Sequence, residues 1–217
     1  MLSFALLMMS VLNSCSSEKE PAGTIGSTET AVTAPEPNVT VSMSHYSVRD
    51  CTGSPHLIPN DMSSVYVGFV YPDDLTPKMT EGWVAESYSD DEGNKHDIEG
   101  GIVGFLKVPQ GYKLTEKVLD LGSPELGTWV GYVDPETKEI GKSDGGLDYI
   151  VFYGNPENES RVAEDHGVTS SDSLLMFVLI DDTYILRLEL WVLGDTDIFD
   201  ELDRAFRTIS LVSAPKT

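Results

Sequence analysis

The segment LLMFVLIDDTYILRLELWVL, residues 174–193, decides the fold that the sequence predicts. Seven apolar residues form its first arm, two aspartates and a threonine follow, and a second arm of ten residues begins at Tyr184, so the segment predicts a β-hairpin. The first arm is apolar on both faces, which is typical of a central strand. The second arm alternates, with Arg187 and Glu189 on one face and apolar residues on the other. We therefore expect a sheet with at least one buried face.

The segment after this hairpin has the pattern of an amphipathic helix. Its apolar residues recur at helical spacing and form one stripe: Ile198, Phe199, Leu202, Ala205, Phe206 and Ile209. Acidic side chains occur early in the segment and two arginines, Arg204 and Arg207, occur late, as the helix dipole favours. Asp195 or Asp197 is the expected N-cap. We expect the apolar stripe to cover one face of the sheet.

Further strands are predicted upstream by runs of alternating, β-branched or aromatic residues that end at proline, glycine or aspartate. The expected strands are residues 39–43, 65–71, 83–88, 97–99, 102–108, 112–121, 128–133 and 147–153, and a short helix is expected at 159–166. The polar segment 89–94 is expected to form a hairpin tip, and Gly100-Gly101 to separate two strands. These elements indicate an α+β domain over residues 39–217, a mainly antiparallel β-sheet packed by the C-terminal amphipathic helix.

Two parts of this domain resemble the Mog1/PsbP-like family. The first is GFLKVPQGYK at residues 104–113, a strand that runs into Pro-x-Gly-aromatic-Lys, where Tyr112 stands in place of the usual tryptophan. The second is the final strand and helix with FRTISL at residues 206–211. The resemblance implies a sheet packed by helices. Because the family includes exported lipoproteins and accessory or binding proteins with no shared activity, it implies a fold and no particular reaction.

The N-terminus resembles a bacterial lipoprotein signal peptide. Residues 4–12 are apolar at all but one position, a core of the length that export signals use and shorter than the roughly 20 residues that span a bilayer. The tetrad Leu12-Asn13-Ser14-Cys15 ends this core and resembles the lipobox. The resemblance implies that Leu12 and Ser14 are recognition positions, that Asn13 is a less usual second position, and that Cys15 carries the acyl chains, palmitate among them.

The predicted organisation has three parts. Residues 1–14 are the expected lipoprotein signal peptide, although no basic residue precedes the apolar run as signals normally have. The alternatives are an ordinary secretory signal and a hydrophobic N-terminal helix, with Cys15 in place by chance. Residues 15–38 hold the lipidated cysteine and then a stretch rich in Ser, Thr, Glu, Pro and Gly, which predicts a disordered tether. Residues 39–217 form the globular domain. We expect a protein that its lipid anchors to the cell membrane, with the domain on the extracytoplasmic side.

The chain is strongly acidic, with 36 Asp and Glu against 14 Lys and Arg and a formal charge of −22. This excess repels phosphate backbones and anionic lipid headgroups, which argues against nucleic-acid binding and electrostatic membrane docking. The expected contact with the membrane is therefore the lipid on Cys15. Acylation of Cys15 leaves the other cysteine, Cys51, without an intramolecular partner, and we interpret Cys51 as a small half-buried hydrophobe rather than a nucleophile.

No motif in the sequence specifies a catalytic, cofactor or metal site. The four histidines are His45, His56, His96 and His166. No two of them have the i,i+4 spacing of a zinc protease helix, and the sequence contains no phosphate loop, nucleophile elbow or dinucleotide fingerprint. We therefore expect a non-catalytic binding or accessory protein of the cell envelope, with no cofactor and with an envelope protein or a glycan as its partner.

Two groups of residues leave alternatives open. Acidic clusters suit a carboxylate hydrolase or a Ca²⁺ site, although aspartate is also favoured in turns because it forms local hydrogen bonds. These clusters are 73–74, 90–92 and 181–182. Three tryptophans suit a glycan-binding platform, although aromatic residues in strands usually belong to the core. They are Trp83, Trp129 and Trp191.

Overall fold

The computed structural model of the chain describes residues 35–45, 48–50, 55–56, 65–75, 82–121, 133–181 and 183–213. All of them belong to one compact unit, Ala34–Thr217. The lipobox residues, Cys51 and Trp129 lie outside the described residues. Asn38, which we expected to end the tether, is hydrogen-bonded to the backbone of Phe69 and Tyr71, so the fold includes it.

The larger sheet has the strand order β3-β2-β6-β10-β9-β8-β7, and β5 pairs with β6 as well. These strands are β2 (Val48–Asp50), β3 (Pro55–His56), β5 (Trp83–Ser89), β6 (Lys95–Lys107), β7 (Glu139–Lys142), β8 (Asp148–Tyr153), β9 (Ser171–Leu179) and β10 (Tyr184–Leu193). Every pair is antiparallel except β2 with β6. The predicted α+β class with a mainly antiparallel sheet is confirmed.

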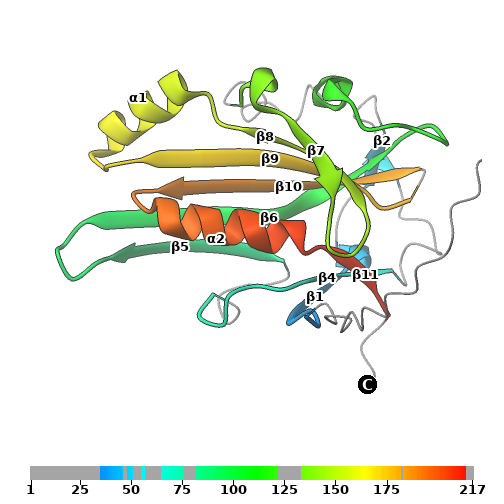
Figure 1. Cartoon of the computed structure of the whole chain (residues 1–217), viewed down its shortest axis with the longest axis horizontal. Helices are drawn as coiled ribbons and strands as arrows, with labels where there is room; N and C mark the ends of the chain where they lie inside the picture. Colours follow the sequence, from blue (N-terminus) through cyan, green and yellow to red (C-terminus); the bar gives the residue numbers. More distant parts are fainter. Residues whose placement is uncertain are drawn as a thin grey trace, which may run out of the picture. The chain divides into compact units, whose positions relative to one another are not determined.

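The remaining elements form a second, smaller sheet and the helices. The smaller sheet consists of β1 (Val39–Ser42), β4 (Tyr66–Phe69) and β11 (Ser210–Val212), with β4 in the middle. The helices are α1 (Pro156–His166), α2 (Thr196–Arg207) and the short 3-10 turns η1 (Met43–His45), η4 (Glu116–Asp120) and η6 (Pro135–Thr137). In Figure 1, α2 runs along the larger sheet beside β10, which it contacts.

The predicted hairpin and helix are confirmed. β9 lies between β8 and β10, and its apolar residues are buried on both faces, as the sequence indicated for a central strand. The apolar face of β10 packs with the stripe of α2 and with the smaller sheet in one core. A second core on the opposite face joins β8, β9 and η4 around Phe152 and Phe177. At the C-terminal end of α2, Arg207 donates to Tyr149 of β8 (2.7 Å) and pairs with Glu139 of β7 (3.0 Å).

Two predicted elements are wrong. The pair Gly100-Gly101 does not separate two strands, because β6 continues through it. A Cβ atom at Gly101 would lie 1.9 Å from the Gly82 carbonyl oxygen, so glycine here permits close approach of β5. Residues 112–121 contain the 3-10 turn η4 (Glu116–Asp120) and no strand, with Val118 and Leu119 buried against the second core.

Other differences concern boundaries and strands that were not predicted, which among the described residues are β2, β3, β7 and β11. The predicted helix at 159–166 begins earlier, at Pro156, because Asn155 accepts hydrogen bonds from the backbone of Glu157 and Asn158 as an N-cap. The strand β7 was not predicted, since its four residues are mostly exposed and contain no hydrophobic run. Of the predicted strand 128–133, only Val133 is described, and it forms a single bridge with Gly154.

Candidate functional site

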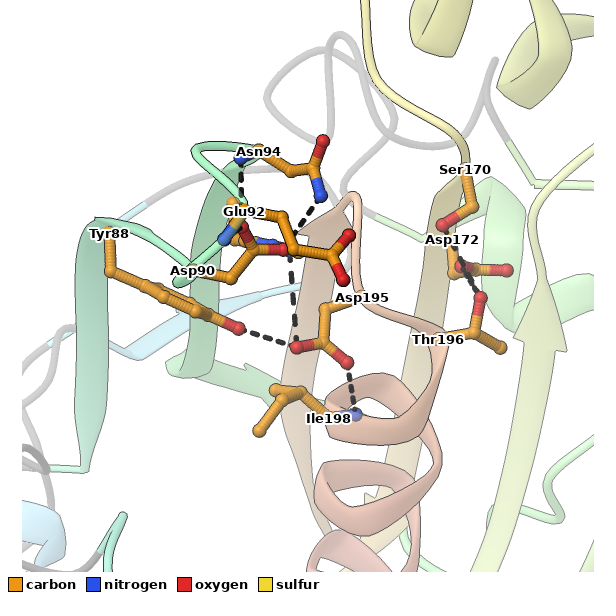
Figure 2. Close-up of polar contacts among 10 residues, drawn as sticks. Tyr88, Asp90, Glu92, Asn94, Ser170, Asp172, Asp195, Thr196 and Ile198 are labelled. Atoms are coloured by element: carbon orange, nitrogen blue, oxygen red, sulfur yellow. Dashed lines mark hydrogen bonds and ion pairs between the residues drawn. The ribbon is translucent and has the colours of Figure 1, made fainter.

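Four polar side chains meet where the β5–β6 hairpin faces the first turn of α2 (Figure 2). They are Tyr88, Asp90, His96 and Asp195, and we call them the hairpin–helix cluster. Tyr88 and His96 are paired across β5 and β6, which places their side chains on the same face. Asp195 reaches them because β10 ends at Leu193 and the chain turns at once into α2.

Asp90 organises the tip of the hairpin. Its Oδ1 accepts hydrogen bonds from the backbone N–H groups of Glu92 (2.9 Å) and Asn94 (2.8 Å), and its Oδ2 accepts from the Asn94 side chain (2.8 Å). These bonds, with the Asn94 side chain foremost, lower the pKa of Asp90 to about 2. The carboxylate is therefore ionised at neutral pH, and the predicted hairpin tip at 89–94 is confirmed.

Asp195 is the N-cap of α2, which settles the two alternatives left by the sequence. Its Oδ1 accepts from the backbone N–H of Ile198 (3.1 Å), and its Oδ2 accepts from the Tyr88 hydroxyl (2.5 Å). Burial, followed by the bond to Asp195, raises the pKa of Tyr88. Tyr88 therefore remains a protonated donor that ties β5 to the helix.

His96 lies between the two carboxylates. It is 8% exposed, and its ring stacks on Tyr88 with centroids 4.7 Å apart and planes 14° from parallel. Its Nε2 is 3.2 Å from Asp90 Oδ2, and its Nδ1 is 3.9 Å from Asp195 Oδ2. Among the described residues, the buried Nδ1 has no hydrogen-bond partner.

A cavity of about 460 Å³ opens beside this cluster, between the hairpin tip and the segment that follows α1. Its lining includes Asn94, Lys95, His96, His166 and Thr169. The turn before α2 comes very close to β6, and only a glycine fits there. Gly194 has φ of 80°, and a Cβ on it would lie 2.7 Å from the Lys95 carbonyl oxygen.

The start of α2 is also held on its other side. Thr196 Oγ1 donates to Asp172 Oδ2 (3.1 Å) of β9, and it lies 3.3 Å from Ser170 Oγ (Figure 2). Burial raises the pKa of Asp172. Contacts on both sides therefore fix the first turn of α2 relative to β5 and β9.

A second surface is the face of the larger sheet opposite α2. Trp83 of β5 is paired with Gly101 of β6, and Trp191 of β10 is paired with Glu99 of β6. Because Glu99 and Gly101 are two residues apart in β6, both tryptophans lie on this face. Both are half-buried. Trp191 donates through Nε1 to Ser171 Oγ (3.2 Å), and its ring meets that of His166 edge-on at 5.9 Å.

Trp191 lines a cavity of about 300 Å³, which we call the Trp191 groove. Its other lining side chains include Ser87, Asp97, Glu99 and His166. Its lining residues include the indole of Trp191 and three acidic residues, Glu86, Asp97 and Glu99, but no Lys or Arg. Aromatic surface and hydrogen-bond acceptors are thus combined in one concave place, as in many ligand sites.

The acidic clusters do not form a common site. Asp90 lies near the end of β10 and Asp181 precedes its start, so the length of this strand, roughly 30 Å at about 3.3 Å per residue, separates them. Asp181 Oδ1 accepts from the N–H groups of Thr183 (2.7 Å) and Tyr184 (2.9 Å), a turn role. Asp73 and Asp74 are exposed in the turn after β4. Carboxylate catalysis needs groups within about 10 Å of each other, which Asp90 and Asp181 do not satisfy.

Sequence reasoning did not single out His96 or Asp195 as one site. Their proximity follows from the β5–β6 register and from the length of β10, which no local pattern contains. Within the described residues, no three or more His, Cys, Asp or Glu side chains are arranged to hold a metal ion. No helix in the described part of the chain has the length and apolar character needed to cross a membrane. No protein-family model and no curated protein matches this chain.

Proposed function

We propose that this protein is a membrane-anchored extracytoplasmic lipoprotein, with lipid on Cys15, and that its domain has a non-catalytic binding or accessory role in the cell envelope. The lipobox-like tetrad and the polar segment after it support the anchor. The charge of −22 supports an anchor that is covalent rather than electrostatic, because the chain and anionic headgroups repel each other.

The Trp191 groove is the observation that carries the binding role. The carboxylates of Asp90 and Asp181 are occupied by turn hydrogen bonds, whereas Asp97 and Glu99 line an open concavity next to an aromatic ring. This arrangement favours a glycan, since the C–H face of a sugar ring packs on an indole while its hydroxyls donate to carboxylates. An envelope protein is the other candidate ligand.

We further propose that the fold is Mog1/PsbP-like. The support is the order of elements from Gly104 onwards: β6 runs towards Pro109, and the last strands of the larger sheet are followed by α2 and β11. The α+β class is consistent with this assignment, and a fold shared with accessory proteins agrees with a binding role but implies no activity.

Replacing Cys15 with serine is expected to abolish membrane anchoring. A serine hydroxyl does not replace the acylated sulfur, and each acyl CH₂ buried in the bilayer contributes about 0.8 kcal/mol. The measurement is labelling with a palmitate analogue in a bacterial host, followed by detergent phase partitioning. Cys51→Ser is the matched control and is expected to keep the label. A labelled Cys15→Ser chain, or an unlabelled wild-type chain, would contradict the anchor without bearing on the groove.

Replacing Trp191 with leucine is expected to weaken glycan binding about tenfold or more, the loss of one aromatic contact of about 1.4 kcal/mol. The measurement is titration of the full-length chain with soluble glycan strands prepared from peptidoglycan, followed by calorimetry. Glu99→Gln is expected to weaken binding as well, and Glu136→Gln, an exposed carboxylate in η6, to leave it unchanged. A wild-type chain that does not bind, or equal affinities for all variants, would exclude the groove as a glycan site.

A further inference from the structure

We propose that His96 is a pH-responsive lock between the β5–β6 hairpin and α2, which tightens when Nδ1 takes up a proton and donates it to Asp195. The inference rests on the geometry of the hairpin–helix cluster and is independent of the proposed function. It gives a role to the buried Nδ1 atom of His96, which has no hydrogen-bond partner among the described residues.

In the neutral imidazole of His96, one ring nitrogen carries the proton and the other accepts. An ionised carboxylate only accepts hydrogen bonds, so Nε2, at 3.2 Å from Asp90 Oδ2, must be the protonated nitrogen. Nδ1 is then an acceptor, and Asp195 Oδ2, which lies 3.9 Å from it, is another acceptor. The neutral ring therefore leaves a buried polar atom unpaired, which is unfavourable.

Protonation turns Nδ1 from an acceptor into a donor that faces the acceptor Asp195 Oδ2. The ring becomes a cation with a donor on each side, and a carboxylate already stands opposite each donor. The side chain of His96 is only 10% exposed, against 35% for Asp90 and 23% for Asp195, so solvent screens the new contact weakly. Closing the Nδ1–Oδ2 distance from 3.9 Å to the usual charge-assisted length of about 2.8 Å needs a movement of about 1 Å.

The surroundings contain other titratable or charged groups on each element that packs against the cluster. They are Glu86 and Tyr88 on β5, Asp90 at the hairpin tip, Lys95 on β6, His166 at the end of α1 and Asp195 at the start of α2. Only Asp90 and Asp195 form ion pairs with the His96 ring nitrogens among the described residues. Tyr88 and Asp90 keep their charge states near neutral pH, because the pKa of Tyr88 is raised and that of Asp90 lowered.

The sign of the pH dependence follows from the bond itself. The contact with Asp195 exists only in the protonated ring, so its stabilisation is present at lower pH and is lost as pH rises. Gly194, next to Asp195, lies close against the Lys95 backbone of β6, so the contact would hold the start of α2 against the hairpin. His96 and the hairpin tip also line the 460 Å³ cavity.

The test compares unfolding of the full-length chain in urea at about pH 5.5 and 7.5. At each pH, the ratio of folded to unfolded protein is compared between the wild type and His96→Gln. The advantage of the wild type in this ratio is expected to be about tenfold larger at the lower pH than at the higher one. Asp195→Asn keeps a capping side chain for α2 but removes the charge, and it is expected to lose this tenfold gain. His166→Gln, on the rim of the same cavity, is the matched control and is expected to retain it.

A wild type and His96→Gln that respond to pH in parallel would overturn the lock. A full gain in Asp195→Asn would overturn it as well, since Asp90 alone would then account for the effect. If His96→Gln does not fold, an NMR titration of the wild-type chain tests the proposal instead. By NMR, the Asp195 carboxyl carbon is expected to shift in step with protonation of the His96 ring, and a carbon that stays unchanged through that titration would contradict the proposal.

Discussion

Replacing Phe206 with alanine is expected to lower the free energy of unfolding by about 3–5 kcal/mol. Phe206 is 1% exposed near the C-terminal end of α2, and its ring lies 6.4 Å from that of Phe69 in β4. The side chain therefore fills the space where the helix, the larger sheet and the smaller sheet meet. Alanine leaves a cavity that the two sheets are too rigidly paired to close. Urea unfolding of wild type and variant, followed by tryptophan fluorescence, gives the difference.

A double-mutant cycle tests whether the two sheets share one core. Leucine replacements keep the domain folded, since each costs less than about 1.5 kcal/mol. Phe69→Leu and Phe206→Leu are expected to be coupled by about 0.5–1.5 kcal/mol, because their rings are in contact. Phe69→Leu and Phe152→Leu, whose side chains lie in different cores, are the matched control and are expected to be additive. Additivity of the first pair would show that α2 and the smaller sheet pack independently.

The elements that the sequence predicted well are those whose pattern is complete within a short window. The hairpin of β9 and β10 was predicted because its apolar arms flank an aspartate turn, and α2 because its stripe, cap and terminal arginines agree. The prediction at Gly100-Gly101 was wrong because the reason for this glycine pair lies outside the local window. Glycine is usually a break, but here it is required by the backbone of Gly82, which lies nearly twenty residues earlier.

The candidate site was predicted less well for the same physical reason. Asp90 was expected to form a turn, and Trp191 to belong to the core with a glycan platform as the alternative, because each role depends on its local sequence. The meeting of His96 with Asp195 depends instead on strand order and on the length of β10. Local patterns therefore predict elements and caps, whereas the pairing of distant side chains follows from sheet register.

The second large effect on the free energy of unfolding is expected at the face of β10 that carries Arg187 and Glu189. The alternation of the strand placed Arg187 and Glu189 together on the face away from α2, and polar residues there are usually solvated. In the structure their side chains are only 15% and 5% exposed, with Nε and Oε1 3.2 Å apart. Burial raises the pKa of Glu189, and the arginine opposes this shift. The site thus disfavours the charge of Glu189 even with its partner present.

Replacing Arg187 with methionine is expected to lower the free energy of unfolding by about 3–5 kcal/mol at pH 7, because it leaves a buried carboxylate without its cation. The double variant Arg187→Met/Glu189→Leu is expected to recover most of this loss, since two apolar side chains need no compensating charge. Lys142→Met, which breaks an ion pair exposed at the edge strand β7, is the matched control and is expected to change stability by less than about 1 kcal/mol.

The pH dependence of these variants separates charge from packing. Because the folded pKa of Glu189 is raised, the native state holds this proton more tightly than the unfolded chain, so stability falls as pH rises from about 4.5 through the folded pKa. The deficit of Arg187→Met is therefore expected to shrink between pH 7 and pH 5, as Glu189 becomes neutral, whereas the double variant should show no such change. Urea unfolding at both pH values measures this. A deficit that is the same at both pH values and persists in the double variant would mean that Arg187 acts through the packing of its methylene groups, with no role for the buried charge.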